Sequence, residues 1–226
     1  MTNNKRRLFS LTIFFVLCFT LFLSAQTGKK VLTLDNYPRW KHIISPAISA
    51  DGNWASYTLR PNGGDDTLFI KSLMTDKIYE IANGSRLAFS EDSRWAAYMI
   101  GLAKAEAEKL RKEKKPVPLK AELLSLASGE KWTVENASSF SFSKDSRFFA
   151  IRKEKMDKDA KHNGTDLLLR DLEKGSVLNI GNVFDYKFNK PGTLFAYTVD
   201  AADKRANGIC LMELGTGVLK VLDAGE

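Results

Sequence analysis

One short pattern occurs four times in this chain, and it limits the possible folds more than any other feature. It consists of an apolar residue, Ser, any residue, Asp, a small residue, any residue, an aromatic residue, any residue, a small residue and a second large apolar residue. The copies occupy Ile48–Tyr57, Phe89–Tyr98, Phe142–Ile151 and, in a degenerate form, Phe188–Tyr197. Their fourth positions are residues 51, 92, 145 and 191, so successive copies lie 41, 53 and 46 residues apart. A four-stranded propeller blade needs ~40–50 residues.

The centre of each copy is typical of a tight hairpin turn. Short side chains that can hydrogen-bond their own backbone stand beside a residue that tolerates a positive φ. The turn residues that we single out are Asp51, Gly52, Asp92, Ser93, Asp145, Ser146, Pro191 and Gly192. We expect the strand before each turn to end on a buried Ile or Phe. The strand after it alternates large and small residues, which suits a strand packed on both faces.

A second strand pair follows each copy, with a short polar turn between its strands. The pairs are Thr67–Leu73 with Lys77–Ile81, Ala121–Leu126 with Lys131–Val134, Asp166–Leu172 with Ser176–Ile180, and Ile209–Leu214 with Val218–Leu222. The predicted fold is therefore all-β, a β-propeller with four visible blades. We place the blades at about 43–82, 85–135, 138–181 and 183–223, after a lead-in segment 26–42. A β-sandwich shares the turn spacing, but it would not repeat one signature at blade length.

A charged insertion, residues 104–118, explains why the second interval is the longest. Its first twelve residues hold six basic and three acidic side chains, and Pro116 and Pro118 follow them. This composition favours a helix that the prolines end. A basic patch can attract nucleic acid or an anionic surface, but no aromatic residues are interleaved here for base stacking. We interpret the insertion as a solvated arm that offers a contact for a protein partner, and we expect no nucleic-acid binding.

The first twenty-five residues have the layout of a secretory signal peptide. Three basic residues precede the uncharged apolar run Leu8–Leu23, and Ser24-Ala25-Gln26 offers a small residue for cleavage. We therefore expect export to the periplasm or the medium, with only transient membrane contact through residues 1–25. The alternative is an uncleaved membrane anchor, since sixteen apolar residues fall slightly short of a span. Removal of the segment would lower the net charge from +7 to +4, because it takes away three positive charges.

Residues that bind metals or form disulfides are scarce. Only Cys210 remains after the leader, so no intrachain disulfide is expected, and its apolar neighbours predict that it is buried. The two histidines, His42 and His162, have no neighbours at metal-ligand spacing. The pair Asp65–Asp66 and the turn positions form no recognisable inward carboxylate cluster. We therefore predict no metal, no cofactor and no metal-dependent propeller enzyme.

Two stretches point to a family. Leu32–Lys41 and Ile48–Ala55 resemble the beginning of secreted bacterial peptidases of the prolyl oligopeptidase family, in its dipeptidyl and acylaminoacyl peptidase branch. The lysine-rich insertion is similar to theirs as well. The resemblance covers residues 31–226, although TolB-like and other WD40-like propellers share the repeat unit itself. It implies a propeller that precedes an α/β-hydrolase domain with catalytic Ser, Asp and His, caps the active site and restricts substrates to peptides.

None of that catalytic half is visible in this sequence. It contains no Gly-x-Ser-x-Gly segment, and both histidines precede any position that the hydrolase histidine could occupy. We assign no catalytic residue and leave open whether the chain is an enzyme. We expect the non-catalytic propeller portion of an exported serine peptidase, gating peptide access and packing on a hydrolase domain that would receive the peptide substrate.

The number of blades also indicates whether the chain is part of a longer protein. Four is the lower end of the ~4–8 blades of propellers, and the sequence reads as if cut at a blade boundary. We therefore expect an incomplete ring, a fragment of a longer protein. The alternative is a stand-alone TolB-like propeller in the periplasm or on the cell surface that binds a protein or a glycan.

Overall fold

The computed structural model describes residues 33–155, 157 and 159–224. The predicted signal peptide, with its apolar run, and most of the lead-in segment lie outside the described residues. The chain divides into two compact units, Met1–Tyr37 and Pro38–Glu226. Of the first unit, the structure describes residues 33–37, where the 3-10 helix η2 (Leu34–Arg39) begins. No helix in the described ranges is long and apolar enough to cross a membrane.

The second unit consists mainly of antiparallel strands. Their bounds are β1 (Lys41–Ile48), β2 (Trp54–Pro61), β3 (Thr67–Ser72), β4 (Ile78–Ala82), β5 (Gly84–Phe89), β6 (Trp95–Ile100), β7 (Lys120–Ser125), β8 (Lys131–Val134), β9 (Ala137–Phe142), β10 (Phe148–Lys153), β11 (Thr165–Asp171), β12 (Val177–Phe188), β13 (Leu194–Val199), β14 (Gly208–Glu213) and β15 (Leu219–Ala224). The α-helix α2 (Lys104–Lys112) lies between β6 and β7. The predicted strand pairs and the helical insertion are therefore confirmed.

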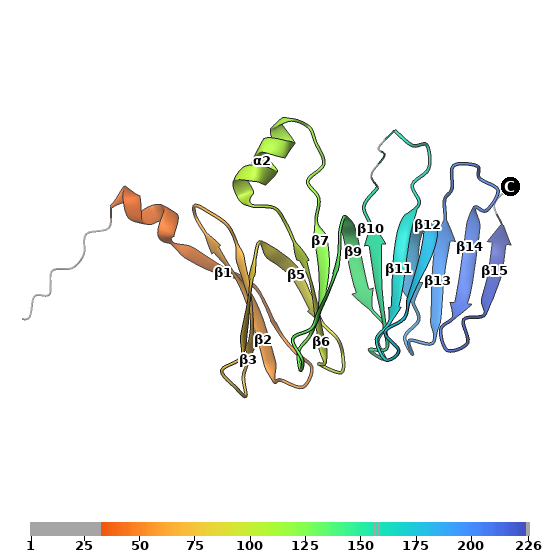
Figure 1. The fold of residues 1–226 in the computed structure, drawn as a ribbon, viewed down its shortest axis with the longest axis horizontal. Helices are drawn as coiled ribbons and strands as arrows, with labels where there is room; N and C mark the ends of the chain where they lie inside the picture. The colour runs from red at the N-terminus through yellow and green to blue at the C-terminus, as the bar shows by residue number, and fades with distance from the viewer. Residues whose placement is uncertain (1–32, 156, 158, 225–226) are drawn as a thin grey trace, which may run out of the picture. The chain divides into compact units, whose positions relative to one another are not determined.

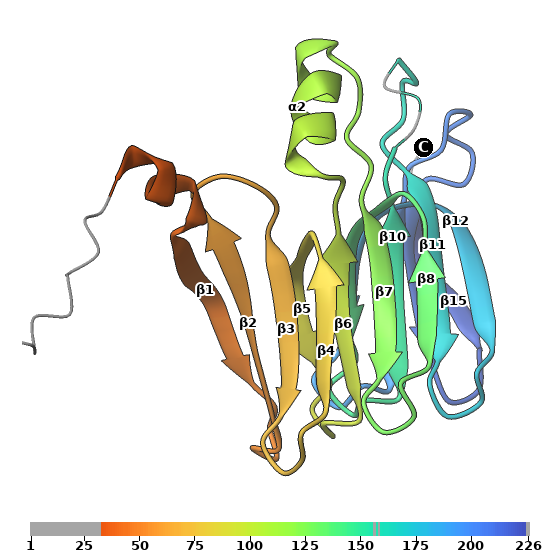
Figure 2. The same ribbon diagram turned by 60° about the vertical axis from the view of Figure 1, so that its left-hand side comes forward.

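Neighbouring strands in the chain pair with one another, which is the up-and-down order of propeller blades. Blade 1 is the sheet β1-β2-β3-β4 and blade 2 is the sheet β5-β6-β7-β8. Blades 3 and 4 follow as β9 to β12 and β12 to β15 (Figures 1 and 2). This arrangement confirms the all-β propeller-type fold. It also excludes a two-sheet sandwich, in which each sheet buries one face, because the sheet of blade 2 packs against blade 1 on one face and against blade 3 on the other.

Near residues 181–183, where we place the boundary between the third and fourth blades, the chain continues as one strand. The twelve-residue strand β12 runs through this boundary, and seven strands join in one sheet. Val183 pairs with Thr165 on one side and with Val199 on the other, so it belongs to both blades. Register shifts on both sides of Val183, together with a positive φ of 55° at Asn182, bend the strand instead of ending it.

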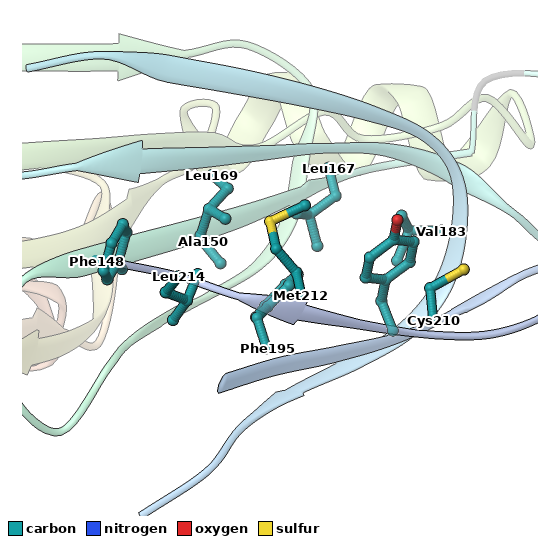
Figure 3. Packing of buried hydrophobic residues seen from close by; sticks show 10 residues of the cluster. Phe148, Ala150, Leu167, Leu169, Val183, Phe195, Cys210, Met212 and Leu214 are labelled. Carbon is teal, nitrogen blue, oxygen red and sulfur yellow. The ribbon is translucent and has the colours of Figure 1, made fainter. Parts of the chain in front are cut away.

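The core consists of three clusters of buried side chains, each made by two successive blades. Successive side chains of a strand point to opposite faces of its sheet, so the central strands serve two clusters. In β6, Ala96 and Tyr98 pack towards blade 1, whereas Ala97 and Met99 pack towards blade 3. Both alanines are 0% exposed, which confirms the expectation of strands packed on both faces. Figure 3 shows the cluster that blades 3 and 4 form.

The residues that end the strands before the signature turns are less buried than expected. Phe89, Phe142 and Phe188 are partly buried and pack against the three clusters. Ile48 is 64% exposed, so the prediction of a buried residue is wrong in blade 1. The reason is its place in β1, most of which is exposed and which contributes no residue to the three clusters.

Candidate functional site

The signature turns lie at one end of the strands, and each is stabilised by its own short side chains. In the first copy, Ser49 Oγ donates a hydrogen bond to Asp51 Oδ1 (2.6 Å), and the backbone N–H of Asn53 donates to the same oxygen (3.0 Å). The backbone N–H of Trp54 donates in turn to Ser49 Oγ (3.0 Å). The second and third copies repeat the bond from Ser to Asp, at 2.6 and 2.5 Å. Gly52, Ser93, Ser146 and Gly192 have the positive φ values that the pattern predicts.

These bonds change the acidity of the turn carboxyls. Donation from Ser49 and from the backbone N–H of Asn53 lowers the pKa of Asp51 to about 2, from an ordinary value of 3.8. Burial would raise the pKa of Asp92, but hydrogen bonds from Ser90 and Arg94 outweigh it, and the pKa is lowered. Both turns therefore favour the ionised carboxylate.

Two of the turn serines also connect neighbouring blades. The backbone N–H of Asp51 donates to Ser93 Oγ of the next blade (3.1 Å). The backbone N–H of Asp92 donates to Ser146 Oγ (2.9 Å). Both serines are buried. We call this bond between blades the serine clasp; the sequence pattern predicted only the turns.

At the third junction Gly192 takes the place of the serine. A Cβ atom on Gly192 would lie 2.5 Å from Asp145 Cγ, so the Asp145 carboxylate fills the space that a side chain would need. The glycine of the fourth copy therefore has a steric cause. In the sequence, the fifth position is Ser in copies two and three and Gly in copies one and four. A Cβ atom on Gly52 of copy one would meet nothing within 4 Å, so the glycine alone does not reveal the close approach at Gly192.

The opposite end of the strands carries the longer loops, 62–66, 101–119, 154–164 and 200–207 (Figures 1 and 2). We call this end the loop face. Three asparagines link one blade to the next there, each with a positive φ of 55° or 56°; they are Asn83, Asn136 and Asn182. Their carbonyl oxygens accept hydrogen bonds from the backbone N–H groups of Gly101 (3.0 Å), Glu154 (2.6 Å) and Asp200 (2.9 Å). Each link thus holds the loop of the following blade, because Asn tolerates the left-handed conformation.

The predicted arm rises from the loop face of blade 2 as α2 and the prolines after it (Figure 2). The residue before the helix, Ala103, provides no side-chain cap. Instead Asp65 of blade 1 accepts a hydrogen bond from the backbone N–H of Lys104 (2.7 Å). A carboxylate at this end also interacts favourably with the helix dipole. With Ala107 buried beneath it, the arm is fixed to the neighbouring blade.

A polar groove of about 580 Å³ lies on the blade 1 side of the arm. Its lining includes His42, Arg60, Asp65, Asp66 and Arg111. Arg60 makes a bidentate ion pair with Asp66 (2.7 Å), and His42 Nε2 lies 2.9 Å from Asn62 Oδ1. Asp65 thus bonds the beginning of α2, and Asp66 bonds Arg60. Across the described ranges, no group of three His, Cys, Asp or Glu side chains is placed to hold a metal ion.

A second groove lies on the other side of the arm and is formed by two cavities, of about 460 and 280 Å³. Leu110 and Pro116–Pro118 line the larger cavity, and His162 and Thr165 line the smaller one. Both cavities share Asn136, Glu154 and Lys155, so they form one continuous depression, which we call the arm groove. Sequence reasoning identified the arm but not this groove, because its second wall comes from blade 3.

Blade 2 contains a buried charged group that the sequence did not reveal. Glu122 is 7% exposed, accepts hydrogen bonds from Tyr98 Oη and Thr133 Oγ1 (3.0 Å), and pairs with Lys131 Nζ (2.9 Å). Burial, followed by the bond to Glu122, raises the pKa of Tyr98. Cys210 is 9% exposed, as predicted. Burial and the neighbouring Cys210 raise the pKa of Tyr197 to about 12.

The described part of the chain is therefore an array of β-propeller blades, with signature turns at one end and an arm and two grooves at the other. Among solved structures, it is similar to β-propeller domains of peptidases. The propeller domain of the Trilobed protease from Pyrococcus furiosus is 16% identical over 81% of this chain and 58% of its own length, with a TM-score of 0.49. The Pyrococcus horikoshii acylaminoacyl peptidase is 17% identical over 83% of this chain, with a TM-score of 0.47.

The chain spans 33% of the length of that acylaminoacyl peptidase. A structure of a different class, a 6-phosphogluconolactonase-like protein from Bacteroides uniformis, is 13% identical over 86% of this chain, with a TM-score of 0.40. No protein-family model matches the sequence, and no curated protein matches it.

Proposed function

We propose that this chain is the non-catalytic propeller portion of an exported serine peptidase. In this role it packs on an α/β-hydrolase domain and limits access to peptides. The observation that carries the proposal is the arm, which rises from the loop face, is fixed to blade 1 through Asp65 and divides that face into two grooves. Loops held by a rigid scaffold are where propellers and similar folds place their function.

The physical basis of gating is size. A folded domain of about 100 residues has a radius of gyration of roughly 13 Å, whereas an extended chain is only a few ångströms across. If the entrance to the hydrolase domain lies at the loop face, an anchored arm beside it would admit extended peptides and exclude folded proteins. The resemblance of Leu32–Lys41 and of the insertion to secreted peptidases supports the hydrolase partner. The basic residues and apolar run of the leader support export.

The decisive experiment uses the complete reading frame that contains this chain. We expect it to encode a Gly-x-Ser-x-Gly segment downstream, and the whole protein to cleave peptide anilides that residues 26–226 alone leave intact. Replacement of residues 104–117 by a short Gly-Ser link should increase cleavage of long or partly folded substrates much more than cleavage of short peptides. Shortening of loop 202–206 is the matched control and should leave this ratio unchanged.

Three results would contradict the proposal: a reading frame without a hydrolase segment, hydrolysis by residues 26–226 alone, or an unchanged substrate-size preference after the arm is removed. The leader is tested separately, by N-terminal sequencing of the protein recovered outside the cytoplasm. Cleavage after Ala25 is expected, and an intact N-terminus in the membrane fraction would support the anchor instead.

A second candidate is a stand-alone propeller that binds a protein or a glycan. The polar groove favours it, because polar and charged side chains such as His42 and Arg111 line it. A reading frame without a hydrolase segment, combined with retention of an extracellular partner on the purified chain, would support this candidate over the peptidase.

A further inference from the structure

The last strand of each blade, which we call its outer strand, carries an aromatic side chain at the first two junctions between blades. Tyr79 of blade 1 stacks on Trp54, with ring centroids 6.0 Å apart, and its hydroxyl donates a hydrogen bond to the carbonyl of Leu126 in blade 2 (3.3 Å). Trp132 of blade 2 contacts Arg170 of blade 3, whose guanidinium lies 4.7 Å from the centre of the indole ring. Each ring therefore bridges its own blade and the next.

The equivalent residue at the third junction is Leu178 of β12. The register fixes this equivalence, because each of the three residues pairs with a buried core residue of the preceding strand; the pairs are Tyr79–Ile70, Trp132–Leu123 and Leu178–Leu169. Leu178 is 46% exposed. A short aliphatic side chain thus takes the place that an aromatic ring has at the first two junctions, and almost half of it remains in contact with water.

A pocket of about 310 Å³ lies at this third junction. Leu178 lines it from blade 3, and the turn 214–217 lines it from blade 4. At the first junction, a Cβ atom on Gly129 would lie 3.3 Å from Tyr79 Oη, because the ring lies against the turn of blade 2. Gly217 closes the same kind of turn in blade 4, and a Cβ atom there would meet nothing within 4 Å. The space that a ring fills at the first junction is therefore open at the third.

The surface beside the pocket is aliphatic on both walls. In β15, the outer strand of blade 4, Leu219 pairs with Met212 and Val221 pairs with Cys210. Both therefore point to the face of blade 4 that packs on blade 3. They are 50% and 59% exposed. Together with the pocket and Leu178 on the opposite wall, they form an elongated apolar depression, which we call the outer crevice.

The strand edge beside the outer crevice indicates what kind of ligand fits. Residues 177–180 of β12 pair with β11 alone, and no strand in the described ranges covers their other edge. Such an edge presents backbone N–H and C=O groups that an added strand can pair with. Tyr79 and Trp132 also reach their junctions from extended strands. A protein segment can supply both a ring and an extended main chain, whereas a small aromatic molecule supplies only the ring.

We propose that the outer crevice is a docking site for an extended segment of a protein partner that carries an aromatic residue. The ring enters the pocket between Leu178 and the turn 214–217, and apolar neighbours in the segment cover Leu219. The inference is independent of the proposed function. The turn 214–217 lies at the signature-turn end of the strands, away from the arm, since the N–H of Leu214 donates to the carbonyl of Thr193 in the fourth signature copy (2.9 Å).

The test uses fluorescein-labelled peptides of the form Gly-Gly-Thr-X-Thr-Val-Gly with an amidated C-terminus. Anisotropy is followed on titration with the purified chain, at concentrations at which sedimentation velocity detects only monomer. With X as Tyr or Trp, we expect binding at least about tenfold tighter than with X as Ala, because an aromatic ring buries far more apolar surface than a methyl group.

Leu178→Tyr tests the pocket directly, because the introduced ring takes the position that Tyr79 has at the first junction. Affinity for the peptide with X as Tyr should fall at least about tenfold. The melting temperature should stay the same or rise, since the ring covers apolar surface that is now exposed. Asn179→Tyr, on the same strand with its side chain on the opposite face, is the matched control and should leave affinity unchanged. Should Leu178→Tyr fold poorly, Leu219→Ser on the other wall is the second variant, and it should weaken the same peptide several-fold.

The proposal fails if the peptides with X as Ala and X as Tyr bind equally, or if Leu178→Tyr binds the second of them normally. Equal affinity for N-acetyltyrosinamide and for the peptide would assign the pocket to small aromatic molecules instead. Loss of self-association in Leu178→Tyr, without peptide binding by the unchanged chain, would assign the outer crevice to a second copy of the chain. None of these outcomes changes the result expected for the arm, where the proposed function is tested.

Discussion

The smallest unit of this structure is a serine and an aspartate two residues apart. Ser49 and Asp51 each bond a backbone N–H just beyond the turn, and they bond each other. Such local bonds offer the backbone partners that a sharp turn would otherwise lack. The same pair recurs as Ser90 with Asp92 and as Ser143 with Asp145. The pattern is therefore a turn device that recurs in the first three blades.

This device predicts an acid-sensitive contribution to stability. The pKa of Asp51 is about 2 in the folded chain, below its ordinary 3.8, so the folded state binds fewer protons than the unfolded state in this range. The contribution is fully present above the ordinary value and is lost as the pH falls towards 2. The lowered pKa of Asp92 acts in the same direction. Urea unfolding midpoints should therefore fall between about pH 5 and pH 2.

Asp51→Asn isolates this effect, because the amide oxygen can still accept the bonds from Ser49 and from the backbone N–H of Asn53 but does not titrate. The bond from Asn53 Nδ2 to Asp51 Oδ2 (2.7 Å) is lost at every pH, so its loss lowers the unfolding midpoint without changing the slope of the midpoint with pH. Its unfolding midpoint should fall less steeply with acidification than that of the unchanged chain. Glu91→Gln, an exposed neighbour of the second turn, is the control. Parallel pH profiles for Asp51→Asn and the unchanged chain would contradict the prediction.

At the scale of strands, blade 2 is stabilised by one buried carboxylate that bonds side chains of the two neighbouring strands. Glu122 of β7 accepts bonds from Tyr98 of β6 and Thr133 of β8, and it pairs with Lys131. Removal of a partner from such a group leaves polar atoms buried and unsatisfied. Glu122→Ala should therefore lower the free energy of unfolding by about 3 kcal/mol.

Glu122→Gln provides the comparison. Its amide can bond to both Tyr98 and Thr133, so the loss should stay near 1 kcal/mol, a typical value for one hydrogen bond (~1 kcal/mol). Equilibrium urea unfolding at neutral pH measures both values. Equal losses for the two substitutions would show that the side chain contributes by packing and not by its bonds.

How far the sequence predicted these elements depends on whether the signal was local. Turn chemistry and alternation lie within a few residues, so β3, β4, β7, β8, β14 and β15 began and ended within one or two residues of their predicted positions. The continuation of β12 was missed because Asn182 and Gly181 resemble a turn, whereas pairing with Thr165 and Val199 decides the outcome. The serine clasp, Glu122 and the arm groove depend on residues about 25 to 55 positions apart, for which no local pattern exists.

At the scale of the whole molecule, much apolar surface remains exposed on the fourth blade. Strand β15 is exposed throughout, including Leu219, Val221 and Leu222. Val177 and Leu178, in the part of β12 that pairs with β11 of blade 3, are about half exposed as well. Contiguous apolar surface on a strand at the edge of a sheet promotes association. We therefore expect the purified chain to self-associate as its concentration rises.

Leu219→Lys combined with Val221→Lys should shift the chain towards monomer, because two charges would have to be desolvated in any contact. Sedimentation velocity across a range of concentrations measures the shift. Lys220→Arg, on the same strand, is the matched control and should leave association unchanged. A chain that is monomeric at every concentration without these substitutions would contradict the prediction.

The strand β12 gives the molecule a mechanical asymmetry. Blades 1 and 2 each end in a strand of their own, and the turn at Asn83 stands between them, so tension can separate them by opening hydrogen bonds and side-chain contacts. Blades 3 and 4 also meet at an asparagine with a positive φ, Asn182, but the next residue, Val183, pairs with Thr165 of blade 3 and with Val199 of blade 4. Separation of blades 3 and 4 under tension therefore requires backbone pairing at Val183 to break. Separation of blades 1 and 2 requires no strand pairing to break, because β4 and β5 belong to different sheets.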